Sequence, residues 1–352
     1  FRSQLIEIAR SVATGAKVLV FDEPTSSLSQ PDIEKLFALI RQLKKKNYAI
    51  VYISHFLEEI QEISDRFTVL RDGQSVGTGQ TAGARVDDII SMMVGRNVED
   101  LYPRSDRSRG ELICEVNSLA GKNKPKNVSL KLYRGEVVGI AGVVGAGRTE
   151  FLRCLFALDP VRSGQIKIAG LSRGLSPSRL WRQGVGVVSE DRKREGLATQ
   201  LSVADNLTMS DQPAIITPLW QRKACQTWVD KIPIKCASPF QSVDSLSGGN
   251  QQKVAIARLL HADVDILLLD EPTRGIDVGS KAQIYQLIDE LAVGAHDSGI
   301  KPKGILMISS YLPELLGICD RIGVMYKGKL GKIKPVDEVD KHNIMLEATG
   351  GG

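Results

Sequence analysis

The fold is decided by the stretch Ile266-Leu267-Leu268-Leu269-Asp270-Glu271-Pro272-Thr273, which follows Ser247-Gly248-Gly249-Asn250 in the same chain. The apolar run predicts a strand buried in a parallel sheet, because such strands are continuously hydrophobic instead of alternating. The strand ends at the sheet edge where ligands bind in such folds. There Asp270 is expected to bind Mg²⁺ and Glu271 to orient an attacking water. The alternative is that these carboxylates only cap the next helix.

The chain repeats this pattern. Val18–Thr25 (Val-Leu-Val-Phe-Asp-Glu-Pro-Thr) has the same strand and the same acidic pair, and Ser3–Arg10 matches Gln251–Arg258 at the same offset. Further on, Ile53–Glu59 matches Ile308–Glu314 after an insertion in the second copy. Three matches in one order predict two tandem α/β domains.

Three residues of the first copy are therefore candidates for chemistry. Asp22 is expected to bind Mg²⁺, and Glu23 is expected to be catalytic. His55 follows the next strand, where it would contact the γ-phosphate of a bound nucleoside triphosphate and the attacking water. A lone histidine is more often an ordinary core or surface group, but the register of the repeat favours the catalytic role. Ser310 takes this position in the second copy, which weakens the γ-phosphate contact there.

The second copy also contains a phosphate-binding loop. The strand Val137–Ala141 leads into Gly142-Val143-Val144-Gly145-Ala146-Gly147-Arg148-Thr149, a G-x-x-x-x-G-K-[ST] loop with arginine in the lysine position. Its backbone N–H groups are expected to hold phosphates, and Thr149 is expected to ligate Mg²⁺. Arg148 keeps the charge but not the compact geometry of an ammonium, so nucleotide binding should survive better than hydrolysis. The alternative is a glycine-rich turn without a ligand.

Composition and turn residues divide the chain into two domains. We expect residues 1–100 to be the C-terminal part of a first domain and 111–352 to be a second, complete one, with a helical subdomain at about 200–260. Residues 101–110, polar and rich in turn formers, are the expected linker. The chain opens on Phe1 within the repeat, from which we expect an N-terminal truncation. Helices are predicted after Pro31 and over Val86–Val94.

Length and charge narrow the class of protein. With 352 residues and 42% hydrophobic content, the chain can bury two cores. The net charge of +5 comes from scattered lysines and arginines, so we predict no nucleic-acid partner. We find no apolar run long enough for a transmembrane segment. The five cysteines show no C-x-x-C spacing and are expected to be free, mostly buried thiols in a cytosolic chain.

These motifs resemble the ATP-binding subunits of bacterial ABC importers for monosaccharides, the ribose, galactose and xylose group. The resemblance covers essentially the whole chain. It is carried by Gly-Ala-Gly-Arg-Thr-Glu at 145–150, Ser-Glu-Asp-Arg-Lys-Arg-Glu-Gly-Leu at 189–197, Ser-Leu-Ser-Gly-Gly-Asn-Gln-Gln-Lys at 245–253, Asp-Glu-Pro-Thr-Arg-Gly-Ile-Asp at 270–277 and Ile-Ser-Ser-Tyr-Leu-Pro-Glu at 308–314.

The resemblance implies tandem ABC-type P-loop ATPase domains, with mixed, mainly parallel sheets and a helical signature subdomain. Ser247, Gly248 and Gly249 would be the nucleotide-binding signature. Glu190 would take the place of the usual glutamine near Mg²⁺. Residues 111–132 contain no aromatic platform for adenine. ATP and Mg²⁺ are the implied cofactors, in two unequal sites of which the one with Arg148 turns over slowly or not at all.

The implied function is ATP hydrolysis coupled to monosaccharide import. Its partners would be integral-membrane permease subunits with a separate sugar-binding protein. The chain would be peripheral, on the cytoplasmic face of the inner membrane. We expect the partner-facing surface near Glu190–Leu207, where charge reversal at Arg192 or Lys193 should uncouple transport while sparing nucleotide binding. The alternatives are a soluble tandem ATPase of the translation-factor type and an inactive, truncated remnant.

Overall fold

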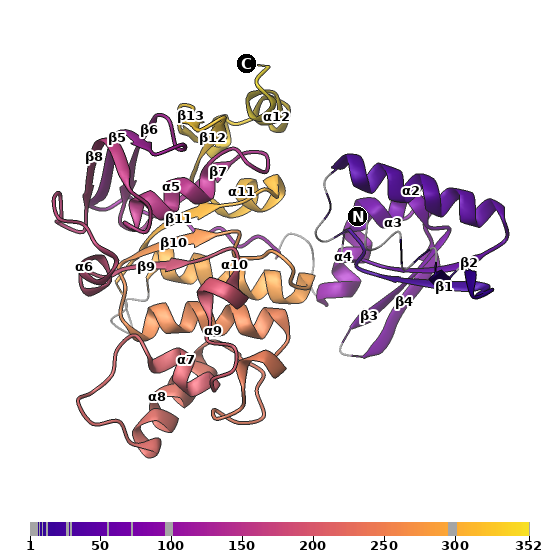
Figure 1. Cartoon of the computed structure of the whole chain (residues 1–352), viewed down its shortest axis with the longest axis horizontal. Helices are drawn as coiled ribbons and strands as arrows, with labels where there is room; N and C mark the ends of the chain where they lie inside the picture. Colours follow the sequence, from indigo (N-terminus) through magenta and orange to yellow (C-terminus); the bar gives the residue numbers. More distant parts are fainter. Residues whose placement is uncertain are drawn as a thin grey trace. The chain divides into compact units, whose positions relative to one another are not determined.

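The computed structural model describes the chain except residues 1–5, 7, 9, 12, 26–27, 29, 55, 72, 96–100, 295–300 and 352. The chain forms two compact units (Figure 1). The first comprises Phe1–Leu101 with Asp277–Gly279, and the second comprises Tyr102–Ile276 with Ser280–Gly352. Strands and helices alternate along much of both units, as the sequence predicts.

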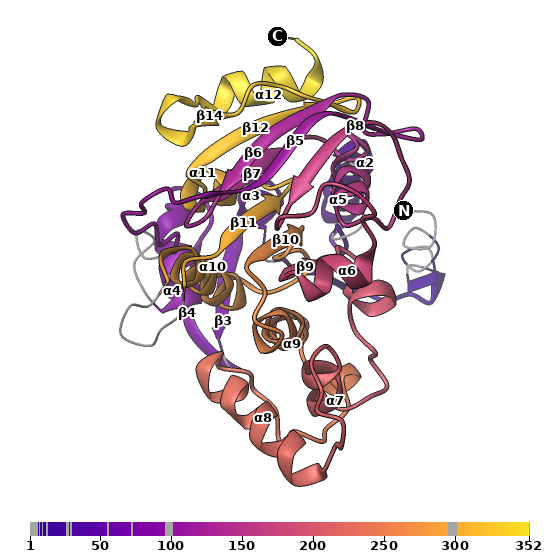
Figure 2. The same cartoon turned by 90° about the vertical axis from the view of Figure 1, so that its left-hand side faces the viewer.

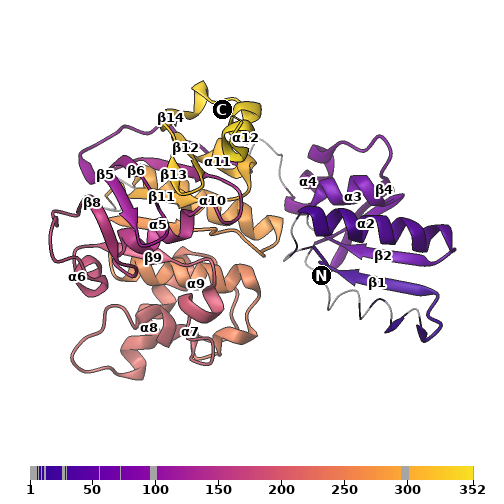
Figure 3. The same ribbon diagram turned by 45° about the horizontal axis from the view of Figure 1, so that its top comes forward.

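Among the described residues, the first unit contains two small sheets and the helices α2, α3 and α4. Strands β1 and β2 pair in parallel, and β3 and β4 form an antiparallel hairpin. Helix α2 buries Leu36, Phe37 and Ile40 against Leu19 and Phe21 of β1, along one face of the β1–β2 pair (Figure 3). The helices predicted after Pro31 and over 86–94 are confirmed. The elements are β1 (Val18–Asp22), α2 (Gln30–Lys45), β2 (Ala49–Ile53), α3 (Leu57–Ile63), β3 (Arg66–Arg71), β4 (Gln74–Gln80) and α4 (Val86–Val94).

The other face of β1 departs from the prediction of a strand that is buried throughout. Val18 and Val20 are 58% and 64% exposed, and Val51 and Ile53 of β2 are also exposed. Burial therefore alternates along β1, because α2 covers one face and no described residue covers the other. The repeat-related strand of the second unit is buried at every position.

The second unit is organised around a seven-stranded sheet. Its main order is β13-β12-β7-β11-β10-β9, with β14 paired to β12. The four central pairings are parallel, and only β13 and β14 add antiparallel edges, as predicted for a mixed, mainly parallel sheet. The strands are β7 (Val137–Ala141), β9 (Val185–Val188), β10 (Ile266–Asp270), β11 (Gly304–Ile308), β12 (Arg321–Tyr326), β13 (Lys329–Leu330) and β14 (Lys334–Pro335).

This sheet is covered on both faces, which explains its continuous apolar strands. Alternate residues belong to different cores: Leu268 faces one and Leu267 the other. The first core lies under α5 (Arg148–Leu155) and an antiparallel sheet ordered β6-β5-β8. The second lies under α9, α10 and α11, and Figure 2 shows the two layers on opposite sides of the sheet. These elements are β5 (Leu112–Gly121), β6 (Val128–Tyr133), β8 (Val161–Ile168), α9 (Gly248–His261), α10 (Val278–Val293) and α11 (Leu312–Ile318).

Further helices and helical turns complete the second unit. In the region predicted to be a helical subdomain, α7 (Val203–Thr208), α8 (Pro218–Lys231) and the short 3₁₀ turn Val243–Ser245 precede α9. They gather below the sheet in Figure 1. Elsewhere lie α6 (Pro177–Arg182), a π-helical turn at Arg192–Gly196, a 3₁₀ turn at Val336–Glu338 and α12 (Lys341–Thr349).

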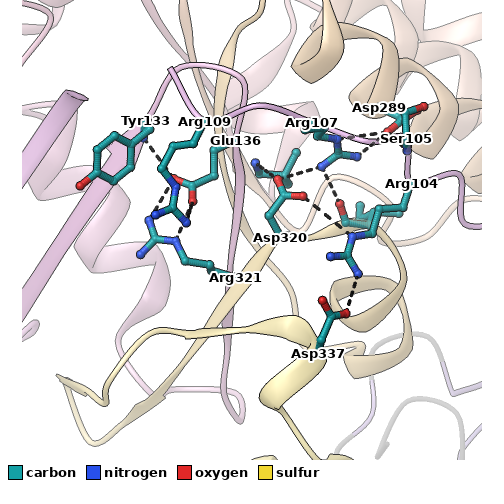
Figure 4. A network of polar contacts seen from close by, with 12 residues as sticks. Arg104, Ser105, Arg107, Arg109, Tyr133, Glu136, Asp289, Asp320, Arg321 and Asp337 are labelled. Atoms are coloured by element: carbon teal, nitrogen blue, oxygen red, sulfur yellow. Dashed lines mark hydrogen bonds and ion pairs between the residues drawn. The ribbon is translucent and has the colours of Figure 1, made fainter. Parts of the chain in front are cut away.

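The predicted linker is fixed to the second unit. Residues 102–110 contain no helix or strand, but the Arg107 side chain is only 2% exposed. Its guanidinium pairs with Asp289 of α10 at 2.5 Å and with Asp320 at 3.1 Å (Figure 4). Burial alone would raise the pKa of Asp289, but hydrogen bonds from Ser105 and Arg107 outweigh it and lower that pKa. The polar composition of this segment therefore serves a buried ion-pair network.

Two other predictions can be compared with the fold. All five cysteines are free, and all but Cys236 are buried. Burial raises the pKa of the Cys154 thiol to about 11 and that of Cys225 to about 12. Among the helices within the described residues, we find none with the length and hydrophobicity needed to span a bilayer.

Candidate nucleotide-binding site

The phosphate-binding loop connects the central strand β7 to α5. Gly145 and Gly147 have φ values of 80° and 108°, which side chains with a Cβ rarely adopt. Nothing lies within 4 Å of a Cβ built on Gly145, whereas one on Gly147 would meet Lys124 and Gly328. Ala146 is fixed on both sides, because its N–H donates to Val143 and its carbonyl accepts from Gly328. Hydrogen bonds at Ala146 thus fix the loop, and the space next to Gly145 is open to a ligand.

Arg148 is turned into the protein. Its side chain is 8% exposed, and one terminal nitrogen of the guanidinium lies 3.0 Å from a carboxylate oxygen of Glu271. The other terminal nitrogen donates to the Ser309 carbonyl. Burial lowers the pKa of Arg148, against the opposing effect of Glu271 and Asp270. The arginine of the phosphate loop is therefore engaged by an intramolecular ion pair.

Asp270 and Glu271 lie at the end of β10, beside the loop. Glu271 has a left-handed backbone with φ of 47°, and its N–H donates to Ile308 of the neighbouring strand at 2.9 Å. Its carboxylate also accepts from Ser310 at 3.1 Å. Burial raises the pKa of Glu271 even with Arg148 beside it. Such backbone strain at a strand end is typical of functional positions.

The donor set around Asp270 fits a divalent cation. Asp270 is 3% exposed, and its Oδ1 atom has no hydrogen-bond partner among the described residues. Burial raises its pKa to about 6, although Thr149 hydrogen-bonds the carboxylate and opposes this. An orphaned carboxylate oxygen beside a threonine hydroxyl suits Mg²⁺, which takes few protein ligands and shares phosphate oxygens. The described residues contain no cluster of three or more His, Cys, Asp or Glu side chains for a metal.

A buried glutamate to which the motifs assign no role supports this edge of the sheet. Glu314 is 1% exposed and accepts hydrogen bonds from Thr273, Tyr285 and Ser309. These contacts fix the loop after Glu271 and the segment whose carbonyl binds Arg148. The internal repeat indicates the importance of Glu314, because Glu59 occupies the matching position in the first unit. There it accepts from Ser54 and Tyr52, at 2.8 Å each.

The segment after β9 contacts the loop that follows Glu271. Glu190 forms an ion pair with Arg274. The guanidinium of Arg192 donates to the carbonyls of Arg274 at 3.0 Å and Gly275 at 3.4 Å. Burial lowers the pKa of Arg192. The Arg192 guanidinium thus binds the loop after Glu271 within its own unit, whereas Lys193 is exposed.

The Ser247-Gly248-Gly249 segment begins α9. Ser247 caps the helix by accepting from the Asn250 N–H and its side-chain amide, the latter at 2.9 Å. Gly248 is close to Arg192, because a Cβ built on it would lie 2.6 Å from a guanidinium nitrogen. Ser247 is exposed and Gly249 is buried. Among the described residues, we find no hydrogen bond between this segment and the loop 142–149.

The first unit repeats the geometry of the acidic pair. Asp22 ends β1, and Glu23 has a φ of 42°, close to that of Glu271. The Glu23 N–H donates to Ile53 at 2.9 Å, as Glu271 donates to the matching residue of β11. Both Asp22 and Glu23 are exposed. His55, the third predicted residue here, lies outside the described residues.

Comparison with known proteins agrees with this geometry. The family model described as "ABC transporter" matches residues 125–274. A protein named Ribose import ATP-binding protein from Lactococcus lactis is 42% identical over 99% of this chain and 71% of the relative. Proteins of the same name from Halalkalibacterium halodurans and Rubrobacter xylanophilus are 41% and 42% identical, each over 99% of this chain and 70% of the relative. The chain belongs to the family of ATP-binding proteins of ABC sugar importers.

Solved structures of ABC proteins have the same fold. A dimeric ATP-binding cassette in a post-hydrolysis state bound to ADP and phosphate superposes with a TM-score of 0.55 at 21% identity, covering 64% of this chain and 99% of that one. A protein of a Clostridium perfringens ABC transporter complex gives the same TM-score and identity, covering 68% of this importer-family chain and 95% of its own. The predicted fold class is confirmed, with a mainly parallel sheet and a helical region before and including α9.

Proposed function

We propose that this protein energises the import of ribose or a closely related monosaccharide. It is an ATP-binding, ATP-hydrolysing subunit of a sugar ABC importer, and relatives named for ribose import align with 99% of it at 40–42% identity. That similarity along almost the whole chain is the observation that carries the proposal. It does not favour the alternative of a soluble translation-factor ATPase.

The proposed nucleotide site of the second unit uses the backbone of residues 142–149. The N–H groups of this loop and the start of α5 bind phosphate. Thr149 and the orphaned oxygen of Asp270 hold Mg²⁺, which neutralises phosphate charge. Glu190, Ser247, Gly248 and Gly249 are proposed nucleotide-binding residues by resemblance alone.

We propose that this site turns over slowly. Glu271 would have to accept a hydrogen bond from water to activate it, but its carboxylate is already held by Arg148 and Ser310. Ser310 also lacks the ring nitrogen that His55 would offer in the first copy. Asp22, Glu23 and His55 are therefore the proposed Mg²⁺ ligand and catalytic residues of the faster site.

The proposed partners are integral-membrane permease subunits, working with a separate sugar-binding protein. An importer subunit that carries no membrane-spanning helix among its described residues needs a permease to move the sugar. We place it peripherally on the cytoplasmic face of the inner membrane, where ATP is available. Sugar specificity then resides in those partners.

Uptake in cells tests the function as a whole. The chain is expressed in a bacterial strain that lacks its own ribose-import ATP-binding subunit but keeps the permease and binding protein. Uptake of radiolabelled ribose above that of a strain expressing Glu23→Gln, which removes the proposed catalytic carboxylate of the faster site, is the expected result. Mg²⁺-dependent ATP binding without any uptake or hydrolysis would favour the inactive-remnant alternative. Absence of ATP binding would overturn the proposed nucleotide site.

A further inference from the structure

A lysine outside the motif lies against the phosphate loop. Strand β5 ends at Gly121 and β6 begins at Val128, and the turn between them carries Lys122, Lys124 and Lys126. The Lys124 ammonium donates to the carbonyl of Gly145. Its stem lies over the loop, because a Cβ built on Gly147 would be 3.1 Å from Lys124 Cδ. Lys124 therefore lies against the loop at Gly145 and Gly147.

The loop needs such a cation. Phosphate loops normally offer a lysine whose compact ammonium reaches the terminal phosphates. Here Arg148 fills that position, but its guanidinium is buried and donates to Glu271 and Ser309. To reach a phosphate it would have to leave a buried carboxylate uncompensated, which is costly. The loop's own cation is therefore unsuited to bind nucleotide.

Lys124 has the properties that Arg148 lacks. Its side chain is half-buried, its stem is flexible, and its ammonium donates to a neutral carbonyl at an exposed site. Replacing that carbonyl by a phosphate oxygen gives a shorter, charge-assisted hydrogen bond. The space next to Gly145 is open, so a phosphate bound to the loop would meet the ammonium.

We propose that Lys124 supplies the phosphate-binding cation of this site, in place of the lysine that Arg148 replaces. The ligand class is a nucleoside di- or triphosphate, recognised through its phosphates. The inference rests on the proposed nucleotide site and names a residue that the motif does not contain. The other role open to Lys124 is to offer its aliphatic stem to the adenine ring, since 111–132 contains no aromatic residue.

Binding measurements on the full chain separate these roles. Affinities for MgATP, inorganic triphosphate and adenosine are obtained by competition against a fluorescent ATP analogue. Lys124→Gln is compared with Lys122→Gln, which removes the same charge from an exposed position in the same turn. Lys124→Arg keeps the charge and controls for misfolding, with thermal unfolding measured for all variants.

We expect Lys124→Gln to weaken the binding of MgATP and of inorganic triphosphate by about tenfold or more. This is the usual range for losing a hydrogen bond to a charged group. The affinity of Lys124→Gln for adenosine should be unchanged. Lys122→Gln should bind MgATP as tightly as the wild type, and Lys124→Arg should keep most of that affinity. Equal MgATP affinities for Lys124→Gln and Lys122→Gln would overturn the proposal. Equal losses of affinity for adenosine and MgATP in Lys124→Gln would show that Lys124 contacts the adenine base, which would also overturn the proposal. A wild-type chain without ATP binding would instead overturn the proposed nucleotide site itself.

Discussion

The guanidinium of Arg148 lies 3.0 Å from the carboxylate of Glu271, and both side chains are 8% exposed. Arg148 belongs to the phosphate loop, and Glu271 is the candidate that activates water. Because they pair with each other, the guanidinium is not available to phosphate and the carboxylate is not available to water. Ser310 adds a second hydrogen bond to the same carboxylate. A site built in this way can hold phosphates on its backbone while its acidic residue stays committed.

Removing one member of this pair should cost more stability than removing both. Arg148→Met or Glu271→Gln leaves a buried group without its partner, and we expect each to lower the free energy of unfolding by about 3 kcal/mol. The double variant should lose less than either single change. Denaturant unfolding followed by tryptophan fluorescence reports the second unit, because Trp181, Trp220 and Trp228 all belong to it. Additive losses would mean that the two residues are not energetically coupled.

Restoring a lysine in the loop should improve binding without restoring turnover. Arg148→Lys shortens the side chain and frees Glu271, so we expect ATP affinity to rise by about tenfold, in line with one charge-assisted hydrogen bond. Ser310 still lacks a ring nitrogen, and bound ATP should persist in a single-turnover experiment. Arg153→Lys, on the same helix, is the matched control and should change neither quantity. Rapid hydrolysis by Arg148→Lys would show that Arg148 alone limits this site.

Motifs predicted the strands, the loop and the acidic pair, because each depends on local sequence. The repeat also carried Glu59 and Glu314, whose matching hydrogen-bond partners became visible only in the fold. The direction of the Arg148 side chain was beyond prediction from spacing, since it depends on a carbonyl 161 positions away in the chain. Lys124 was missed for the same reason, because its turn is brought to the loop by the packing of β5 and β6.

Val20 shows where local pattern misleads. Its strand has the same apolar run as β10, and burial on both faces was the natural expectation. Yet Val20 is 64% exposed, while its repeat-related residue Leu268 is fully buried under α5 and the antiparallel sheet. An apolar run fixes the strand, but burial of each face depends on which other elements pack there.

The segment 102–110 should contribute measurably to the stability of the second unit. Arg107→Ala leaves Asp289 buried without its guanidinium, and we expect a loss of about 3 kcal/mol. Arg104→Ala is the control, because the Arg104 side chain is 34% exposed and an ion pair of this kind contributes less than about 1 kcal/mol. Tryptophan-detected unfolding measures both, and equal losses would contradict the buried role of Arg107.

The same ion pair should make stability depend on acid pH. Because the folded-state pKa of Asp289 lies below its ordinary value of 3.8, the stabilising carboxylate is present above that value. It is lost as the pH falls through the lowered pKa. The difference in unfolding free energy between wild type and Asp289→Asn should therefore be constant from pH 7 to about 5 and shrink below about 4. A difference independent of pH down to 2 would show that Asp289 does not titrate as part of this pair.

Neighbouring basic residues in the segment after β9 should have different effects. Arg192→Glu removes hydrogen bonds to the carbonyls of Arg274 and Gly275, so we expect a lower melting temperature and weaker ATP binding. Lys193→Glu changes an exposed side chain and should leave both unchanged, while reducing sugar uptake if this surface contacts the permease. Melting temperature, ATP affinity and ribose uptake are measured for each variant. Normal uptake by Lys193→Glu would remove this segment from the proposed permease contact, whereas an unchanged melting temperature in Arg192→Glu would show that its contacts add little to the fold.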